Sequence, residues 1–278
     1  MSAAAAGPGG QRIGYFDHRG RRVAYATVGS GPPLICDVSQ LQHLDVFWRH
    51  PPYRRLVQAL AREFTVVRFD RPGCGLSDRA EADFTIEAEI ELFEQLVRHL
   101  RLEPPSILAS AAAARMTIAI AALRPDRVRR IAVFGVRAGT LPAGLDYRDA
   151  IATLLRTQFE LGVDVLARRL AEGCDAAAVQ WLASAYRRVA SGDVIARWLR
   201  ATTDLDVRGF LPDVRCPTLV LHRRGDRLVQ LREARDVAAR IRDALLVPLD
   251  GAESLAWEGD TGPMVAQLVR FLAGDGRV

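Results

Sequence analysis

Along most of this chain, hydrophobic and polar positions alternate between two patterns, one typical of β-strands and one typical of α-helices. Residues 12–17 and 22–28 alternate apolar and polar side chains around the turn at 17–20, which predicts a β-hairpin. Further on, short apolar runs that predict buried strands are separated by stretches with apolar residues at helical spacing. The runs are 34–36, 64–70, 107–109, 131–134, 217–221 and 244–249, and the helical stretches include 51–62, 86–102, 231–241 and 261–272. This alternation predicts βαβ units and a largely parallel sheet.

From Leu141 to Leu211 the alternation is interrupted, and the pattern is helical throughout. A helical insertion between two sheet strands is expected to lie over the carboxyl ends of the strands, where open α/β sheets bind ligands. Four aromatic residues of the insertion are expected to line a pocket there: Phe159, Trp181, Tyr186 and Trp198. The predicted parts of the single domain are a disordered tail at 1–10, an α/β core at 11–138 and 213–278, and a helical cap at 139–212.

The amino-acid composition argues against a membrane-spanning protein and against a nucleic-acid-binding protein. The 278 residues are 49% hydrophobic, enough for a sizeable core, and no run of 18 apolar residues predicts a membrane span. The net charge is +5, but every basic residue is arginine, and basic and acidic residues alternate as on a solvated helix face. We expect a cytoplasmic protein that binds a small, mostly apolar molecule, binds neither nucleic acid nor membrane, and uses no metal or cofactor. A homodimer or a protein partner is left open.

The four cysteines are far apart and lack metal-binding or redox spacing. They are expected to be reduced thiols of the core or the pocket. The residues are Cys36, Cys74, Cys174 and Cys216.

The segment 106–128 carries the most specific local signal. It joins a short apolar strand through a sharp turn to an alanine-rich helix that ends before Pro125. This is the build of a nucleophile elbow, in which small flanking residues give a strained strand-to-helix turn the room it needs. The tip of the turn falls on Ala111, with Ala109 and Ala113 at the flanking positions.

Four motifs in order resemble the α/β hydrolase fold family over about Ile13 to Phe271. They are the segment Arg68–Asp78, the elbow with its Arg124–Val128 tail, the segment Pro217–Asp226, and Trp257–Asp260. More narrowly, the chain is similar to capped hydrolases that are often linked to nucleotide cyclases or LuxR-type DNA-binding modules. The resemblance implies an α/β fold with a mostly parallel eight-stranded sheet, helices on both faces and an inserted helical cap.

The resemblance also implies a catalytic triad in the chain order Ser, Asp, His. The acid corresponds to Asp226, the serine to Ala111, and the histidine to Ser254. Loss of the serine alone costs a triad hydrolase roughly 10⁶-fold in turnover. We therefore expect no ordinary esterase or epoxide hydrolase activity.

Several neighbouring residues have two interpretations. Ser110 is either a displaced nucleophile or a core hydroxyl, and His43 either borders the pocket or is structural. Near Ser39, the backbone N–H groups of Gln40 and Ala112 are candidates for an oxyanion hole, which needs amides rather than particular side chains. The other histidines, His18, His50, His99 and His222, are not placed to replace the base.

Three charged residues near the predicted pocket also have two interpretations each. Asp226 is either a relic held by backbone amides or Arg227, or an orphaned carboxylate whose pKa is raised by desolvation and which acts as an acid or base. Glu253 either shares the pocket with it or is exposed on a loop. Arg115 is either an anion contact near the helix N-terminus or a surface residue.

Three functions follow from these alternatives. The first is a repurposed pocket that catalyses a cofactor-free, non-hydrolytic step such as a cyclisation, elimination or isomerisation, with Asp226 or Glu253 as the working group. The second is a non-catalytic pseudohydrolase that binds a ligand or a partner. The third is a residual hydrolase that uses Ser110.

Overall fold

The computed structural model describes residues 10–79, 82–140 and 145–274. The tail predicted at residues 1–10 lies, apart from Gly10, outside the described residues. Within them, no helix is both long and apolar enough to cross a bilayer.

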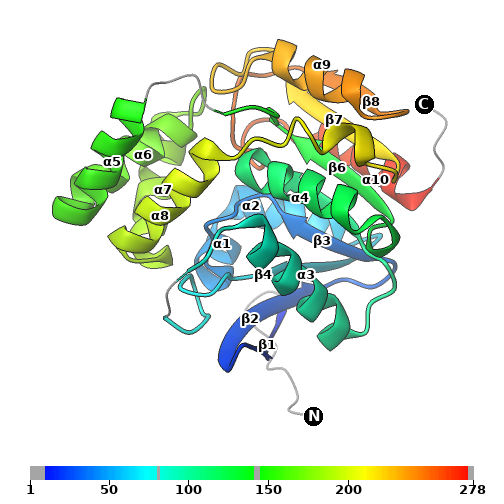
Figure 1. Cartoon of the computed structure of the whole chain (residues 1–278), viewed down its shortest axis with the longest axis horizontal. Coiled ribbons are helices and arrows are strands. Elements are labelled where there is room, and N and C mark those ends of the chain that lie inside the picture. Colours follow the sequence, from blue (N-terminus) through cyan, green and yellow to red (C-terminus); the bar gives the residue numbers. More distant parts are fainter. Residues whose placement is uncertain (1–9, 80–81, 141–144, 275–278) are drawn as a thin grey trace.

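One eight-stranded sheet forms the centre of the molecule (Figure 1). Its strand order is β1-β2-β4-β3-β5-β6-β7-β8; β1 and β2 pair antiparallel, β2 pairs antiparallel with β4, and the remaining pairs are parallel. This confirms the predicted mostly parallel sheet. The strands are β1 (Arg12–His18), β2 (Arg21–Val28), β3 (Pro33–Asp37), β4 (Thr65–Phe69), β5 (Ser106–Ser110), β6 (Arg130–Phe134), β7 (Thr218–Arg223) and β8 (Leu245–Leu249).

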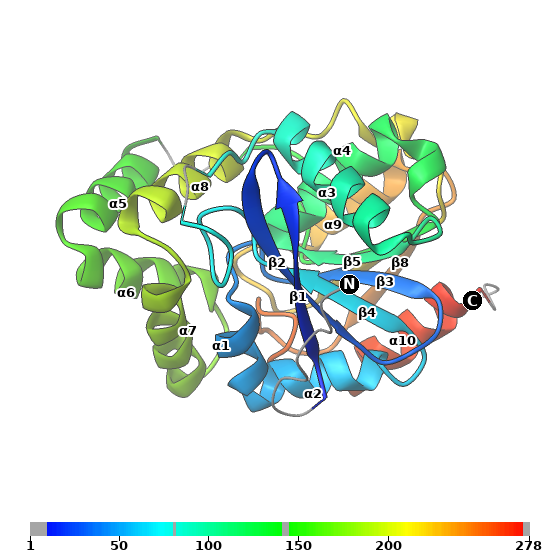
Figure 2. The same ribbon diagram turned by 90° about the horizontal axis from the view of Figure 1, so that it is seen from below.

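Helices cover both faces of the sheet, as Figure 2 shows. One face carries α3 (Ile86–Leu100), α4 (Ala111–Leu123) and α9 (Leu231–Arg240). The other carries α1 (Leu44–Arg49), α2 (Pro51–Leu60) and α10 (Gly262–Ala273). Helix α1, with six residues, was not predicted, because so short a segment shows no helical period. The central strands are buried on both faces, which is why their sequences are almost continuously apolar.

The remaining helices pack together to one side of the sheet (Figure 1). They are α5 (Leu145–Thr157), α6 (Phe159–Leu170), α7 (Ala176–Val189) and α8 (Gly192–Asp204). Two of them begin at side-chain caps: Asp175 accepts from the N–H of Ala178, and Ser191 from the N–H of Val194. Such caps satisfy one of the free N–H groups of the first helical turn. We call these four helices the cap helices; the division of the chain into a core and a cap at 139–212 stays a prediction.

The loop after β4 is fixed by one buried carboxylate. The oxygens of Asp70 accept hydrogen bonds from the N–H groups of Leu44 (3.1 Å) and Leu76 (2.8 Å). A Cβ at Gly75, whose φ is +55°, would lie 2.0 Å from this carboxylate. The glycine in this turn is therefore required by both its backbone conformation and its close approach to Asp70.

Candidate functional site

The elbow is present, and its tip carries a methyl group. Ala111 has φ +50° and is the first residue of α4, directly after the last residue of β5. A non-glycine residue in this left-handed region costs on the order of 1–3 kcal/mol and persists only where the surrounding structure holds it. The preceding Ser110 makes no side-chain cap. The first amides of α4 therefore gain no side-chain acceptor from it.

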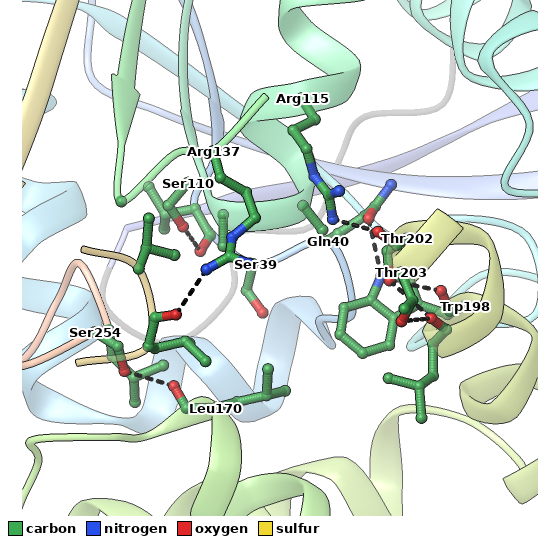
Figure 3. A pocket seen from close by; sticks show the side chains of 18 of the residues that line it. Ser39, Gln40, Ser110, Arg115, Arg137, Leu170, Trp198, Thr202, Thr203 and Ser254 are labelled. Atoms are coloured by element: carbon green, nitrogen blue, oxygen red, sulfur yellow. Dashed lines mark hydrogen bonds between the residues drawn. The ribbon is translucent and has the colours of Figure 1, made fainter. Parts of the chain in front are cut away.

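A cavity of about 130 Å³ lies beside this tip (Figure 3). Its volume is close to that of the roughly 150 Å³ cavity known to hold one benzene molecule. It lies between the elbow, the segments that follow β3, β6, β7 and β8, and the cap helices α6, α7 and α8. The lining residues are Val38, Ser39, Gln40, Ser110, Ala111, Ala112, Arg115, Gly135, Arg137, Leu170, Tyr186, Trp198, Leu199, Thr202, Thr203, Leu228, Val229, Ser254, Leu255 and Trp257.

Ser254, at the position that the resemblance assigns to the histidine, also lines the cavity. Its Oγ donates a hydrogen bond of 2.6 Å to the carbonyl of Leu170, the last residue of α6 (Figure 3). Its backbone N–H donates to the carbonyl of Glu172 at 3.0 Å. These two hydrogen bonds connect the loop after β8 to the C-terminal end of α6.

Asp226 is buried behind the cavity wall. Its Oδ1 accepts hydrogen bonds from the N–H groups of Leu228 (2.8 Å) and Val229 (3.1 Å). Burial raises the pKa of Asp226, and these two amides together with His222 oppose the rise. Asp226 itself does not line the cavity, whereas Leu228 and Val229 do. The carboxylate is thus held by backbone amides, as in the first interpretation, and desolvation raises its pKa, as in the second; its action as an acid or base stays a prediction.

The comparisons with known proteins agree with this fold. The family model for the alpha/beta hydrolase fold matches residues 42–260. The chain belongs to the α/β hydrolase fold family. Within it, the chain is 26% identical over 237 residues to RutD of Caulobacter sp. (strain K31), to which carbamate hydrolysis is attributed; the match covers 79% of this chain and 84% of RutD.

Two further members of the family are also similar. Pyrrolizixenacetamide deacetylase from Xenorhabdus hominickii is 25% identical over 241 residues, covering 80% of this chain and 84% of the deacetylase. The solved structure of the enol-lactonase from Burkholderia xenovorans LB400 superposes with a TM-score of 0.81 at 20% identity, covering 94% of this chain and all of the lactonase. At that identity the likeness shows the fold.

Of the two interpretations of Glu253, the shared pocket is not found, because neither Glu253 nor Asp226 lines the cavity; Glu253 lies half-buried on its loop. The Glu253 carboxylate accepts from the N–H of Ala252 (3.1 Å) and lies 3.6 Å from Nε of Arg223. It is absent from the cavity lining. Because Arg223 is almost completely buried and binds the backbone carbonyl of Glu253 as well, it holds this loop residue away from the site.

Four of the residues predicted for the oxyanion region and the pocket line the cavity, namely Ser39, Gln40, Ser110 and Ala112, and the oxyanion role of the amides stays a prediction. Ser110 Oγ donates to the carbonyl of Val38 at 2.5 Å, and Ser39 Oγ donates to the carbonyl of Leu41 at 2.8 Å. The side chain of Gln40 accepts a 2.8 Å hydrogen bond from Nε1 of Trp198, which joins the core to α8. No histidine and no cysteine is among the cavity-lining residues in the described part of the chain. Ser110 therefore has no imidazole partner there.

Three of the predicted pocket residues lie elsewhere. Trp181 stacks on His50, with ring centroids 3.6 Å apart, and Phe159 packs against the apolar core. His43 precedes α1, its Nδ1 is buried without a partner, and burial lowers its pKa. None of the three lines the cavity, whereas Tyr186 and Trp198 do. The helical spacing predicts that the four aromatic residues of the insertion are in the interior of the cap. It does not specify which of the four line the cavity.

The other histidines and the cysteines are not part of the cavity. Nε2 of His222 donates to the carbonyl of Val229 at 2.9 Å, and burial lowers the pKa of this histidine. His18 bonds Gln95 from the hairpin, and His99 stacks on Phe16. All four cysteines are free thiols, as the sequence predicts.

Two arginines line the cavity, and the sequence placed only one of them as a candidate. Arg115 is 5% exposed and is not a surface residue. Arg137, three residues after the end of β6, was missed. The available signal was its position just after the carboxyl end of a parallel strand, where ligand-binding residues of such sheets gather.

Proposed function

We propose that this chain is a ligand-binding member of its family that does not hydrolyse esters or amides. In this proposal a small, mostly apolar molecule occupies the cavity under the cap, where the described lining residues include no imidazole to activate a serine hydroxyl against it. The observation that carries the proposal is Ala111. Its strained φ of +50° is retained beside a cavity, although a methyl group has no catalytic use for this position.

The lining supports an apolar ligand. Trp198, Leu199, Leu255 and Trp257 supply large apolar surfaces. The hydroxyls of Thr202 and Thr203 donate to carbonyls of their own helix, so their hydrogen-bonding capacity is partly used. Mostly apolar clefts with a few polar groups are typical of small-molecule sites.

The relatives are named for carbamate hydrolysis, deacetylation and enol-lactone hydrolysis. Their shared feature is the hydrolysis of a carbonyl compound. We propose that this chain keeps the location of their site, at the elbow beneath the cap, without that reaction. The carbonyl substrates in those names are not carried over, because the hydroxyl that would attack them is replaced at Ala111.

A second candidate function is a cofactor-free, non-hydrolytic step such as a cyclisation, elimination or isomerisation. The raised pKa of Asp226 favours it, since a carboxyl group that titrates closer to neutral pH is a better proton donor. The first amides of α4 could stabilise an oxyanion. The position of Asp226 behind the cavity wall places this candidate second, because a proton donor must reach its substrate directly or through one water.

The test has two parts. First, a fluorophosphonate probe is added to the wild-type protein, and labelling is measured by intact-mass spectrometry. We expect no adduct, because no lining serine has a base; an adduct on Ser110 would revive the residual hydrolase.

Second, protein from its own host is analysed by native mass spectrometry for a co-purifying small molecule. Ala112→Phe places a ring in the cavity, and Ala177→Phe places the same ring on the exposed side of α7. We expect the bound mass in the wild type and in Ala177→Phe and its loss in Ala112→Phe. A mass retained by Ala112→Phe would place the ligand outside the cavity.

A further inference from the structure

The cavity lining combines apolar side chains with small polar ones, and at one end two arginines from different elements point into it (Figure 3). Arg115 comes from the second turn of α4, and Arg137 from the segment after β6. They are 5% and 8% exposed. Buried cations are rare unless they are paired, so two at one cavity require an explanation.

Arg115 has no carboxylate partner among the described residues. Its guanidinium donates to two backbone carbonyls, those of Thr202 and Leu205, the latter at 2.8 Å. The acid that most favours its charge, Asp206, is bridged to Arg208 and does not line the cavity. Carbonyl dipoles orient this cation but leave its charge uncompensated.

Arg137 is only partly satisfied. One nitrogen, Nη2, donates to the carbonyl of Leu228 (3.0 Å) and to Glu233 (2.9 Å). The other two nitrogens, Nε and Nη1, are buried and have no partner within the described chain. Buried polar groups are nearly always hydrogen-bonded, so an acceptor atom on a ligand would supply the partner that these two nitrogens lack.

The charged residues of the described cavity lining are both cations. Glu233 pairs with Arg137 from outside the lining, and Asp226 and Asp206, which favour the charges of Arg137 and Arg115, also lie outside it. The N-terminus of α4 adds the positive end of a helix dipole beside Ala111. Burial and the neighbouring Arg137 lower the pKa of Arg115 to about 10, which leaves it protonated at neutral pH.

We infer that the cavity takes a small organic anion, a carboxylate with an apolar body of about the size of one aromatic ring, and that Arg115 and Arg137 bind the carboxylate. A carboxylate would accept hydrogen bonds from Nε and Nη1 of Arg137, which have no partner within the described chain, and charge-assisted hydrogen bonds to guanidinium groups are the strong ones. The apolar body fits the tryptophan and leucine side chains of the lining and the cavity volume. This inference rests on the proposed function, since it takes the cavity as the ligand site.

The test compares benzoate with benzamide, two probes of nearly the same shape, of which only benzoate is charged. Binding to the wild-type protein is measured by isothermal titration calorimetry and by ligand-observed NMR. We expect benzoate to bind roughly ten- to a hundredfold more tightly than benzamide, the range for a hydrogen bond to a charged group. Equal binding of the two probes would overturn the anion site while the proposed function stands. Failure of both probes to bind would overturn the proposed function as well.

Variants locate the site. Arg137→Met and Arg115→Met each remove one cavity cation, and Arg200→Met removes one from the exposed side of α8 as the matched control. We expect each cavity variant to reduce the preference for benzoate over benzamide by about tenfold, whereas Arg200→Met leaves it unchanged. Because the readout is the ratio between two probes on the same folded protein, a loss of stability does not imitate it. A benzoate preference that survives in both cavity variants would overturn the inference.

Discussion

The hydroxyl of Ser254 donates a 2.6 Å hydrogen bond to the carbonyl of Leu170 and so joins the loop after β8 to the end of α6. The resemblance assigns this position to the catalytic histidine. Here its side chain binds a cap helix. The role that we observe for the side chain is therefore attachment of the loop to the cap helix.

Ser254→Ala is expected to lower the free energy of unfolding by about 1 kcal/mol, because the half-buried Leu170 carbonyl loses its side-chain donor. Urea unfolding followed by circular dichroism measures this change. Ser184→Ala, on the exposed side of α7, is the control and should change stability by less than about 0.5 kcal/mol. Equal effects of the two substitutions would show that the hydrogen bond contributes nothing.

Restoring both groups tests the mapping of the triad. We expect Ala111→Ser/Ser254→His to hydrolyse p-nitrophenyl acetate at least about a hundredfold faster than either single variant, since a positioned base contributes about 10²–10⁴-fold. Each single variant should remain at the wild-type background, because members of a triad act as a unit.

The control for this experiment is Ser110→Ala in the double variant, which should leave the restored rate unchanged. High activity of Ala111→Ser alone would mean that another base reaches the elbow. That result would contradict the absence of an imidazole from the described cavity lining.

The pKa of Asp226 predicts a pH dependence. Burial raises this pKa in the folded protein, so the folded state binds a proton more readily than the unfolded chain does. The contribution of Asp226 to stability is therefore most favourable below the ordinary Asp value of 3.8 and falls as the pH rises toward its folded pKa. Thermal unfolding of wild type and Asp226→Asn between pH 3.5 and 8 should show a smaller loss of stability with rising pH in the variant.

The matched control is Asp236→Asn, which removes the same charge from the exposed side of α9. The amide oxygen of an asparagine at 226 can still accept from the N–H groups of Leu228 and Val229, so the turn keeps its hydrogen bonds. If the Asp226→Asn and wild-type profiles run parallel, the raised pKa is refuted.

Two glycine substitutions separate backbone strain from collision. Gly75 and Gly20 both have positive φ, but a Cβ at Gly20 meets nothing within 4 Å, whereas at Gly75 it meets the Asp70 carboxylate. Gly20→Ala should cost about 1–2 kcal/mol, the penalty of the left-handed region. Gly75→Ala should cost more by at least about 2 kcal/mol, because Asp70 is held by two amides and cannot move aside without breaking them. If the unfolding free energies of the two variants differ by less than about 2 kcal/mol, the loop around Gly75 rearranges to accommodate the added methyl group.

The sequence by itself determined the order of the eight strands, the helices that alternate with them except α1, and the strand-to-helix turn at Ala111. These depend on local patterns: apolar runs of strand length, helical spacing, and small residues around a tight turn. The absence of a serine at the tip was equally visible, because that position is fixed by its distance from the helix end at Pro125.

Only the tertiary structure decided which side chains meet in the cavity. Arg137 points into it from the segment after β6, whereas Glu253 is held outside by Arg223 and Trp181 lies against His50. The direction of a side chain on a loop or a cap helix depends on which distant segment packs against it. Periodicity within one segment carries no information about that partner, so the two arginines at one end of the cavity became visible together only once the chain was folded.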